Sequence, residues 1–159
     1  MKLKDREKRE FLDHIEDIIN HSEVKKMKQF VQHGSTDTLT HSYIVAYYSC
    51  WVCYRLGIKA DIRSIARGAM LHDFYLYDWH VPDKSHRLHG FFHPAKSLKN
   101  AENHFELGNL EKEIIETHMW PLTIRKIPKS RESAVVCFVD KICSLVEIFT
   151  TRELGEKLF

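Results

Sequence analysis

The sequence predicts an all-α protein with a single domain, a bundle of roughly seven helices. Two observations point to this class: apolar residues recur at helical spacing along most of the chain, and no segment alternates as a strand does. The length of 159 residues is enough for one hydrophobic core and hardly enough for two. We therefore expect residues 1–29 to form a helical extension that packs on residues 30–159.

Each of the first two predicted helices has an apolar face. Over residues 5–20 this face consists of Phe11, Leu12, Ile15, Ile18 and Ile19. Ser22 is a suitable cap for the second helix, and Gly34 suits a left-handed position at its C-terminus. Its inward residues would be Val24, Met27, Phe30 and Val31.

The third predicted helix should lie at the centre of the fold. It opens at Thr38 or Thr40, runs to about Leu56 and is closed by Gly57. Aromatic and aliphatic residues occupy most of its circumference, as expected for a helix that is surrounded by others.

The fourth predicted helix carries an apolar stripe that leads into an acid. Asp61 is a suitable N-cap, and the stripe ends at His72 and Asp73 in the last turn. Burying a carboxylate costs several kcal/mol unless a cation or hydrogen-bond donors compensate it. Imidazole and carboxylate both bind divalent metals, so the neighbouring histidine suggests that the cation is a metal.

Two more helices should follow a long aromatic and histidine-rich connection, Phe74–Phe92, whose length favours a functional loop. Pro94 stands where a first helical residue is expected, which puts His93 at a helix N-terminus. Gly108 should end that helix. Asn109 should cap a short one whose apolar face finishes at His118.

The last predicted helix starts at Ser130, and its helical pattern runs from Ala134 to about Leu154. Asp140 lies in the middle of an apolar stretch of this helix. An aspartate in such a place most often pairs with a buried cationic group.

Composition excludes several functional classes. The net charge of +2 gives no reason to expect nucleic acid or a membrane as a partner, and no apolar run approaches the roughly 18 residues of a membrane span. The charged N-terminus lacks the apolar core of a signal peptide, so we expect a cytoplasmic protein. The four cysteines lie in apolar helical patterns and should be buried, reduced thiols: Cys50, Cys53, Cys137 and Cys143.

Histidine is over-represented, with eleven residues, and several occupy related positions. A lone histidine on an apolar face is more often a hydrogen-bonded core residue than a metal ligand. Here, however, five separate helices each contribute an imidazole or carboxylate near a helix end or on an apolar face. They are His41, His72-Asp73, His93, His118 and Asp140.

The order of these residues resembles the HD superfamily of metal-dependent phosphohydrolases. His41-Ser-Tyr-Ile-Val-Ala46 is similar to the family's first-ligand helix, and Ala69-Met-Leu-His-Asp73 to its hallmark. His93-Pro-Ala-Lys-Ser-Leu98 resembles the start of the next helix, and Phe138-Val-Asp-Lys-Ile142 the closing aspartate helix. The resemblance spans about residues 30–150, so residues 30–159 would be an HD domain.

The resemblance implies a binuclear metal site. His41, His72, Asp73 and Asp140 would hold one ion, and Asp73 would bridge to a second ion held with His93 and His118. Nitrogen and oxygen donors without thiolate suit Fe, Mn, Co or Mg. Such a pair lowers the pKa of a bridging water and clamps a phosphoryl oxygen, so His72 and Asp73 would be central to catalysis.

The substrate implied is a small phosphorylated molecule, nucleotide-like or otherwise, cleaved at a phosphoester or phosphoanhydride by metal-activated hydroxide. The family often continues HD with Ile-Gly-Lys, where this chain has Phe74-Tyr75-Leu76. Phosphate recognition would therefore come from other groups: Lys84, Arg87, His33, Lys141 and Tyr77. The same ligand set is also similar to di-iron oxygenases of the myo-inositol oxygenase type, and a non-catalytic ligand-sensing HD domain is a third alternative.

Overall fold

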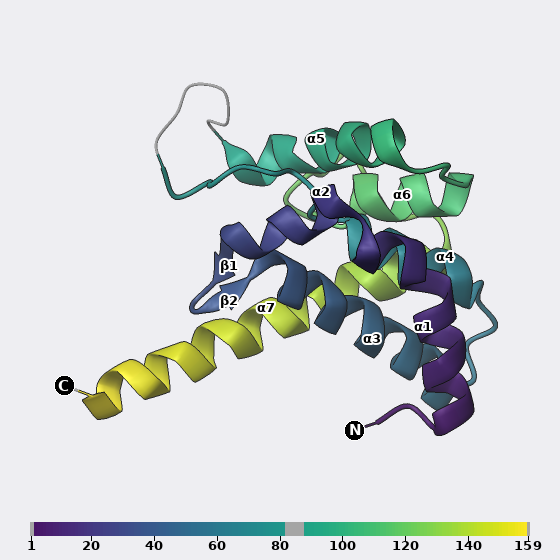
Figure 1. Ribbon diagram of the computed structural model, residues 1–159, viewed down its shortest axis with the longest axis horizontal. Helices are drawn as coiled ribbons and strands as arrows, with labels where there is room; N and C mark the ends of the chain where they lie inside the picture. The colour runs from purple at the N-terminus through teal and green to yellow at the C-terminus, as the bar shows by residue number, and fades with distance from the viewer. Residues whose placement is uncertain (1, 82–87, 159) are drawn as a thin grey trace.

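The chain folds as an all-α bundle, as the sequence predicts, with one small β-ribbon added (Figure 1). The computed structural model describes residues 2–81 and 88–158, with side chains for 2–32, 34–81 and 88–149. These residues form seven α-helices: α1 (Asp5–Asn20), α2 (Ser22–Lys25), α3 (Thr38–Leu56), α4 (Ile62–Leu71), α5 (His89–His104), α6 (Asn109–Thr117) and α7 (Arg131–Leu158). Among the described residues, no helix combines the length and the apolar character needed to cross a membrane.

Helix α3 lies at the centre, as predicted, and packs against α4 and α7. Its start is fixed by Asp37, whose Oδ1 accepts a hydrogen bond from the Thr40 backbone N–H at 2.9 Å. Its end is fixed by Gly57, which takes the left-handed conformation with φ 65°. Both boundaries agree with the prediction to within two residues.

Helix α4 runs through the middle of the bundle and packs on α1, α3 and α6. Asp61 caps it, accepting from the Ser64 backbone N–H at 3.3 Å. Gly68 allows α6 to approach closely, because a Cβ at this position would lie 2.9 Å from Ile114. This close packing of α4 on α6 brings the two helix ends that carry His72 and His118 together.

The segment after α2 differs from the prediction of one helix that ends at Gly34. It forms a 3-10 turn, η1 (Lys26–Gln29), and then an antiparallel ribbon of β1 (Val31–His33) and β2 (Thr36–Asp37). Gly34 does have a positive φ of 58°, but within the turn of this ribbon. Val31 is 43 % exposed instead of facing the core. Strands this short contain too few residues to show alternation in the sequence.

Helix α5 begins earlier than predicted, at His89, so Pro94 is inside the helix and His93 is in its second turn. We expected Pro94 at the first helical position because proline lacks the N–H that would bond to the carbonyl four residues earlier. In the structure, Pro94 instead lies more than one turn after the start of α5. The prediction that His93 lies at the helix N-terminus was wrong.

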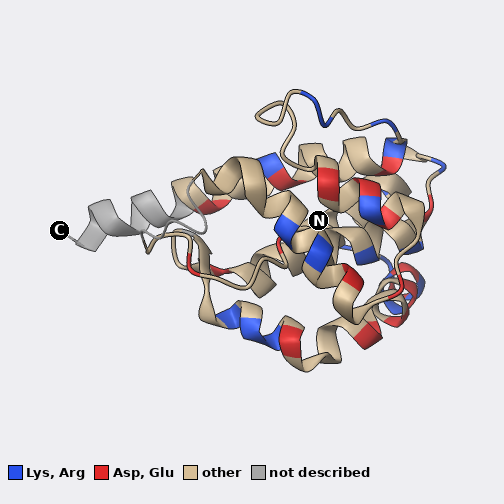
Figure 2. Cartoon of the chain, turned by 90° about the horizontal axis from the view of Figure 1, so that it is seen from above, with Lys and Arg blue, Asp and Glu red and all other residues tan. Residues whose placement is uncertain are grey.

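Helices α6 and α7 start close to their predicted positions. Gly108 is the N-cap of α6 rather than the end of the preceding helix, and the Glu111 carboxylate accepts its backbone N–H at 2.6 Å. Ser130 precedes α7 and its hydroxyl accepts from the Ser133 backbone N–H at 3.1 Å. All four cysteines are buried and free, as predicted. Basic and acidic residues interleave along the described helices (Figure 2).

Candidate metal centre

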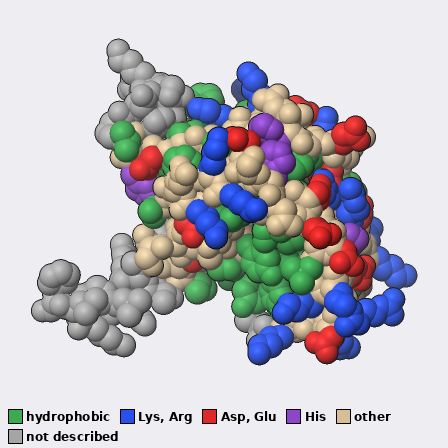
Figure 3. Space-filling view, in the orientation of Figure 1, with side chains coloured by type: hydrophobic (Ala, Val, Ile, Leu, Met, Phe, Trp, Pro, Cys, Tyr) green, Lys and Arg blue, Asp and Glu red, His purple; other side chains and the backbone are tan. Residues whose placement is uncertain are grey.

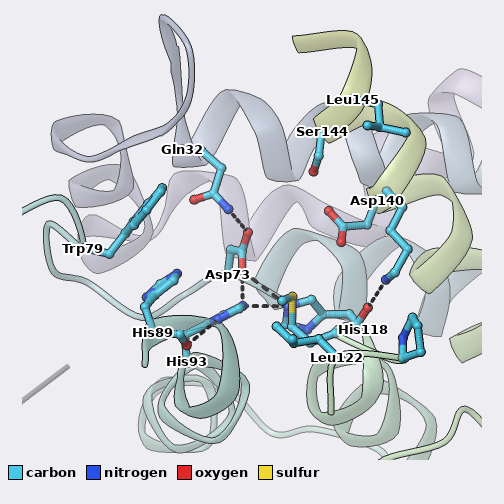
Figure 4. Close-up of a pocket in the computed structure, with 13 residues that line it drawn as sticks. Gln32, Asp73, Trp79, His89, His93, His118, Leu122, Asp140, Ser144 and Leu145 are labelled. Atoms are coloured by element: carbon cyan, nitrogen blue, oxygen red, sulfur yellow. Dashed lines mark hydrogen bonds and ion pairs between the residues drawn. The ribbon is translucent and has the colours of Figure 1, made fainter. Parts of the chain in front are cut away.

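Six side chains from five helices or helix ends converge in the interior of the bundle, and they are the six that the sequence singled out. Figure 4 shows Asp73, His93, His118 and Asp140 among them. His41 is in the first turn of α3, His72 and Asp73 follow α4, His93 is in α5, His118 follows α6 and Asp140 is in α7. Each of them is at most 6 % exposed. We call these six residues the metal centre.

Asp73 lies in the middle, with its two oxygens facing different histidines. Oδ2 lies 3.1 Å from His72 Nε2 and 3.9 Å from His41 Nε2. Oδ1 lies 3.0 Å from His93 Nε2 and 3.5 Å from His118 Nε2. One carboxylate is therefore shared between two groups of ligand atoms.

Asp140 completes the first of these groups. Its Oδ1 lies 3.0 Å from His41 Nε2 and 3.6 Å from His72 Nε2. Two sets of ligand atoms, each within 4.8 Å of one another, could hold a metal ion: His41, His72 and Asp140, and His72, Asp73 and His118.

The backbone fixes which nitrogen each ring presents. His72 Nδ1 lies 2.6 Å from the Ala69 carbonyl, and His118 Nδ1 lies 2.8 Å from the Ile115 carbonyl. His93 Nδ1 lies 3.0 Å from the carbonyl of His89, one turn earlier. A carbonyl oxygen only accepts, so each Nδ1 carries a proton and each Nε2 is left to face the centre.

His41 is oriented by a carboxylate instead. Its Nδ1 lies 3.0 Å from Glu147 Oε2 and 3.1 Å from Oε1, and it donates to this carboxylate. Glu147 was not predicted, although it follows Asp140 by seven residues and hence lies on the same face of α7. That spacing is the signal that could have identified it.

Two atoms of the metal centre lack hydrogen-bond partners among the described residues. His72 Nε2 is buried and makes no hydrogen bond, although Asp73 Oδ2 lies close to it. The same is true of Asp73 Oδ1, which lies close to His93 Nε2. Leaving a buried polar atom unsatisfied costs about 1–3 kcal/mol. A cation among these atoms would remove that cost, so the donor set fits a divalent metal.

The pKa shifts agree with this fit. Burial raises the pKa of Asp73, but the adjacent His72 and the nearby His93 outweigh it and hold the pKa well below its usual range. Burial also raises the pKa of Asp140, but His41 and His72 lower it by more than burial raises it. The pKa of Asp140 therefore lies below its usual range. Burial, assisted by His72 and His93, lowers the pKa of His118 to about 3. Both carboxylates are thus ionised and His118 is neutral, which are the forms that bind metals.

Protons on His41 and His72 balance the negative charge of the carboxylates. Burial lowers the pKa of His41, but Asp140 and Glu147 outweigh it and raise the pKa to about 9. The pKa of His72 is also raised well above its ordinary value: burial lowers it, and the charges of Asp73 and Asp140 more than compensate. A divalent cation can take the place of these protons, because neutral imidazole is itself a ligand.

A cavity of about 750 Å³ opens onto one side of the metal centre. Asp73, His93, His118 and Asp140 contribute to its floor. The apolar side chains that line it are Trp79, Met119, Pro121, Leu122 and Leu145. A space of this volume, lined by apolar side chains and a few polar groups, is typical of a small-molecule site.

Gln32 connects the β-ribbon to the centre, and the sequence gave no indication of it. Its Nε2 donates to Asp73 Oδ2 at 2.6 Å across 41 residues of chain. Its Oε1 accepts from the hydroxyl of the buried Tyr75 at 2.5 Å. The ribbon therefore holds the central carboxylate in position (Figure 4).

The other predicted substrate-binding residues have different positions. Lys141 lines the cavity, but its Nζ donates to the carbonyls of His118 at 2.7 Å and Cys137 at 3.2 Å. The Tyr77 hydroxyl bonds to His89 Nδ1 at 2.8 Å, and Tyr77 does not line the cavity. His33 ends β1, and its side chain is outside the described ones.

Lys84 and Arg87 lie outside the described residues, as does the rest of the segment 82–87.

No family model, curated protein or solved structure matches this chain. The geometry of the metal centre and its cavity is therefore the basis for the function proposed below.

Proposed function

We propose that this protein is a phosphohydrolase that uses two divalent metal ions held by the six residues of the metal centre. The observation that carries the proposal is the position of Asp73, whose two oxygens face His41 and His72 on one side and His93 and His118 on the other. A carboxylate between two groups of imidazoles is the ligand expected to bridge two cations.

The donor set supports a hydrolytic role. Four imidazoles and two carboxylates suit Fe, Mn, Co or Mg rather than a metal that prefers sulfur. When bound, two such ions stabilise negative charge on a phosphoryl group and lower the pKa of a water molecule. The chain's own contribution is to orient the ligands, through Glu147, Gln32 and three helix carbonyls.

The cavity supports a small substrate with an apolar part. The volume of about 750 Å³ is sufficient for a phosphate ester the size of a nucleotide. The phosphate would lie at the floor formed by Asp73 and Asp140. Trp79, Met119 and Leu122 would contact the remainder of the molecule.

A panel of phosphate esters tests the proposal. Phosphate release should be measured under strict anaerobiosis with Mn²⁺ or Mg²⁺, for monoesters, diesters and nucleotide polyphosphates. We expect release from at least one class, loss of that activity in Asp73→Asn, and no effect of Asp13→Asn, a matched change of an exposed acid. Oxygen consumption by an iron-loaded form, without phosphate release under any metal, would instead indicate an oxygenase.

A further inference from the structure

The outer face of α7 carries an unusual row of exposed apolar side chains. Phe138, Ile142, Leu145 and Phe149 are 64 %, 44 %, 54 % and 58 % exposed. We call these four residues the seam. A soluble helix normally turns such residues toward the core, and clustered exposed apolar side chains mark an interaction surface.

Two of the three charged residues in this stretch face the other way. Asp140 and Glu147 lie on the opposite side of the helix from the seam, whereas Lys141 lies beside the seam, three positions after Phe138 and four before Leu145. Asp140 belongs to the metal centre, Glu147 bonds to His41, and Lys141 donates to the His118 carbonyl. The inward side of α7 thus carries Asp140 together with the buried Val136, Val139 and Cys143, and the seam is a further set of apolar side chains left outside.

The spacing of the seam suits a second helix. Its residues are separated by four, three and four positions, which is the alternation of a coiled-coil seam. This order is the same when read from either end of the helix. When two copies of α7 run antiparallel, Phe138 of each copy therefore lies against Phe149 of the other. Ile142 of each copy likewise lies against Leu145 of the other. Such self-complementarity is what a two-fold interface between identical chains requires.

The surface beside the seam is also apolar. A groove of about 460 Å³ runs between α3 and α7, with Ile44, Trp51 and Val52 on one side and Ile142 on the other. Figure 3 shows hydrophobic side chains gathered over α3. At the other end, Phe138 borders a hollow lined by Trp120 and Ile127. The seam of an antiparallel partner would pack beside both the groove and the hollow.

The available area is adequate for a dimer. With roughly 150–250 Å² for a whole aromatic side chain, the half-exposed seam and its flanking residues offer on the order of 500 Å² per copy. Two copies together then reach the roughly 1,000 Å² that a specific interface needs.

We infer that the protein forms an antiparallel homodimer through the seam of α7. Leu145 belongs both to the seam and to the wall of the cavity. The second copy therefore adjoins the cavity, and dimer formation and access to the metal centre share one surface. This inference is independent of which reaction the metal centre catalyses.

Sedimentation equilibrium of the full chain at micromolar concentrations tests the inference. We expect twice the 18.8 kDa of one chain. Ile142→Glu and, separately, Phe149→Glu should raise the dissociation constant at least tenfold while circular dichroism and melting temperature stay close to those of the parent protein. Leu56→Glu is the matched control, since Leu56 is 73 % exposed at the far end of α3, and it should leave the mass unchanged.

Cysteine cross-linking tests the direction of pairing. The double variant Phe138→Cys/Phe149→Cys should form an intermolecular disulfide on oxidation. Neither single variant should do so, because equivalent positions lie about 16 Å apart along antiparallel helices. A monomer at all concentrations, a dimer that Ile142→Glu and Phe149→Glu leave intact, or cross-linking by a single variant would each overturn the inference.

Discussion

His93 Nε2 lies 2.8 Å from His118 Nε2, and the Nδ1 atoms of both rings donate to carbonyls of their own helices. With both Nδ1 positions protonated, two nitrogen lone pairs face each other at hydrogen-bond distance. That contact is unfavourable unless a proton or a metal lies between them. This contact joins α5 to the end of α6.

This contact predicts that His118 is needed for metal binding and that a neighbouring histidine is not. His118→Ala should lower the metal retained after dialysis by about one ion per chain, measured by elemental analysis. His89→Ala is the matched control: His89 also lines the cavity and stacks on His93 at 4.4 Å, but it belongs to neither ligand set. Equal losses in both variants would contradict the assignment of His118.

A second prediction concerns Glu147, whose carboxylate accepts a hydrogen bond from His41 Nδ1. Glu147→Gln should weaken metal affinity about 10–100-fold, because the ring of His41 loses the acceptor that orients it and raises its basicity. Competition with a fluorescent chelator measures this affinity. Glu116→Gln removes an acid that pairs with Lys126 at the surface and should leave the affinity unchanged.

The packing of α4 on α6 gives a prediction about stability. Gly68→Ala places a Cβ 2.9 Å from Ile114, so overpacking should destabilise the fold by about 1–3 kcal/mol in urea unfolding, despite the better helix propensity of alanine. Adding Ile114→Ala makes room for the new methyl group. The double variant should therefore lose less unfolding free energy than the sum of the losses in the two single variants. A loss equal to that sum would argue against a contact between residues 68 and 114.

Glu113 gives a prediction about pH. Burial raises its pKa, but bonds from the Ser130 and Lys129 backbone N–H groups and the Ser133 hydroxyl outweigh burial, so the pKa in the folded state is lowered. Its stabilising effect is then complete above the ordinary pKa of a glutamate and disappears as pH falls through the lowered value. The difference in unfolding free energy between the parent protein and Glu113→Gln should shrink between pH 5 and pH 3. A constant difference would contradict the shift.

Local rules were sufficient to predict most helices, and the six residues that the sequence singled out do come together in the fold. Asp61 and Gly57 end their helices through contacts with near neighbours, and such contacts are visible in sequence. Gln32 reaches Asp73 across 41 residues, and the short β-ribbon that carries it has no period to detect. Only the packed fold brings that amide to the metal centre.

The apolar seam of α7 shows a second limit of sequence reasoning. Val136 and Phe138 are equally apolar in the sequence, yet Val136 is fully buried and Phe138 is 64 % exposed. The difference arises because Asp140 must face the metal centre, and this fixes the rotation of α7 about its axis. A helical period indicates which residues share a face, and the position of the other helices decides which face is buried.

The metal content of the purified protein tests the central claim most directly. Asp73 faces both groups of ligands, so Asp73→Asn should remove both ions, whereas Asp140→Asn should mainly affect one. Chelation should also lower the melting temperature of the parent protein, since ions bound only by the folded state stabilise it. We predict about two divalent ions per chain in the parent protein and almost none in Asp73→Asn. Full metal content in Asp73→Asn, with an unchanged melting temperature on chelation, would contradict the account.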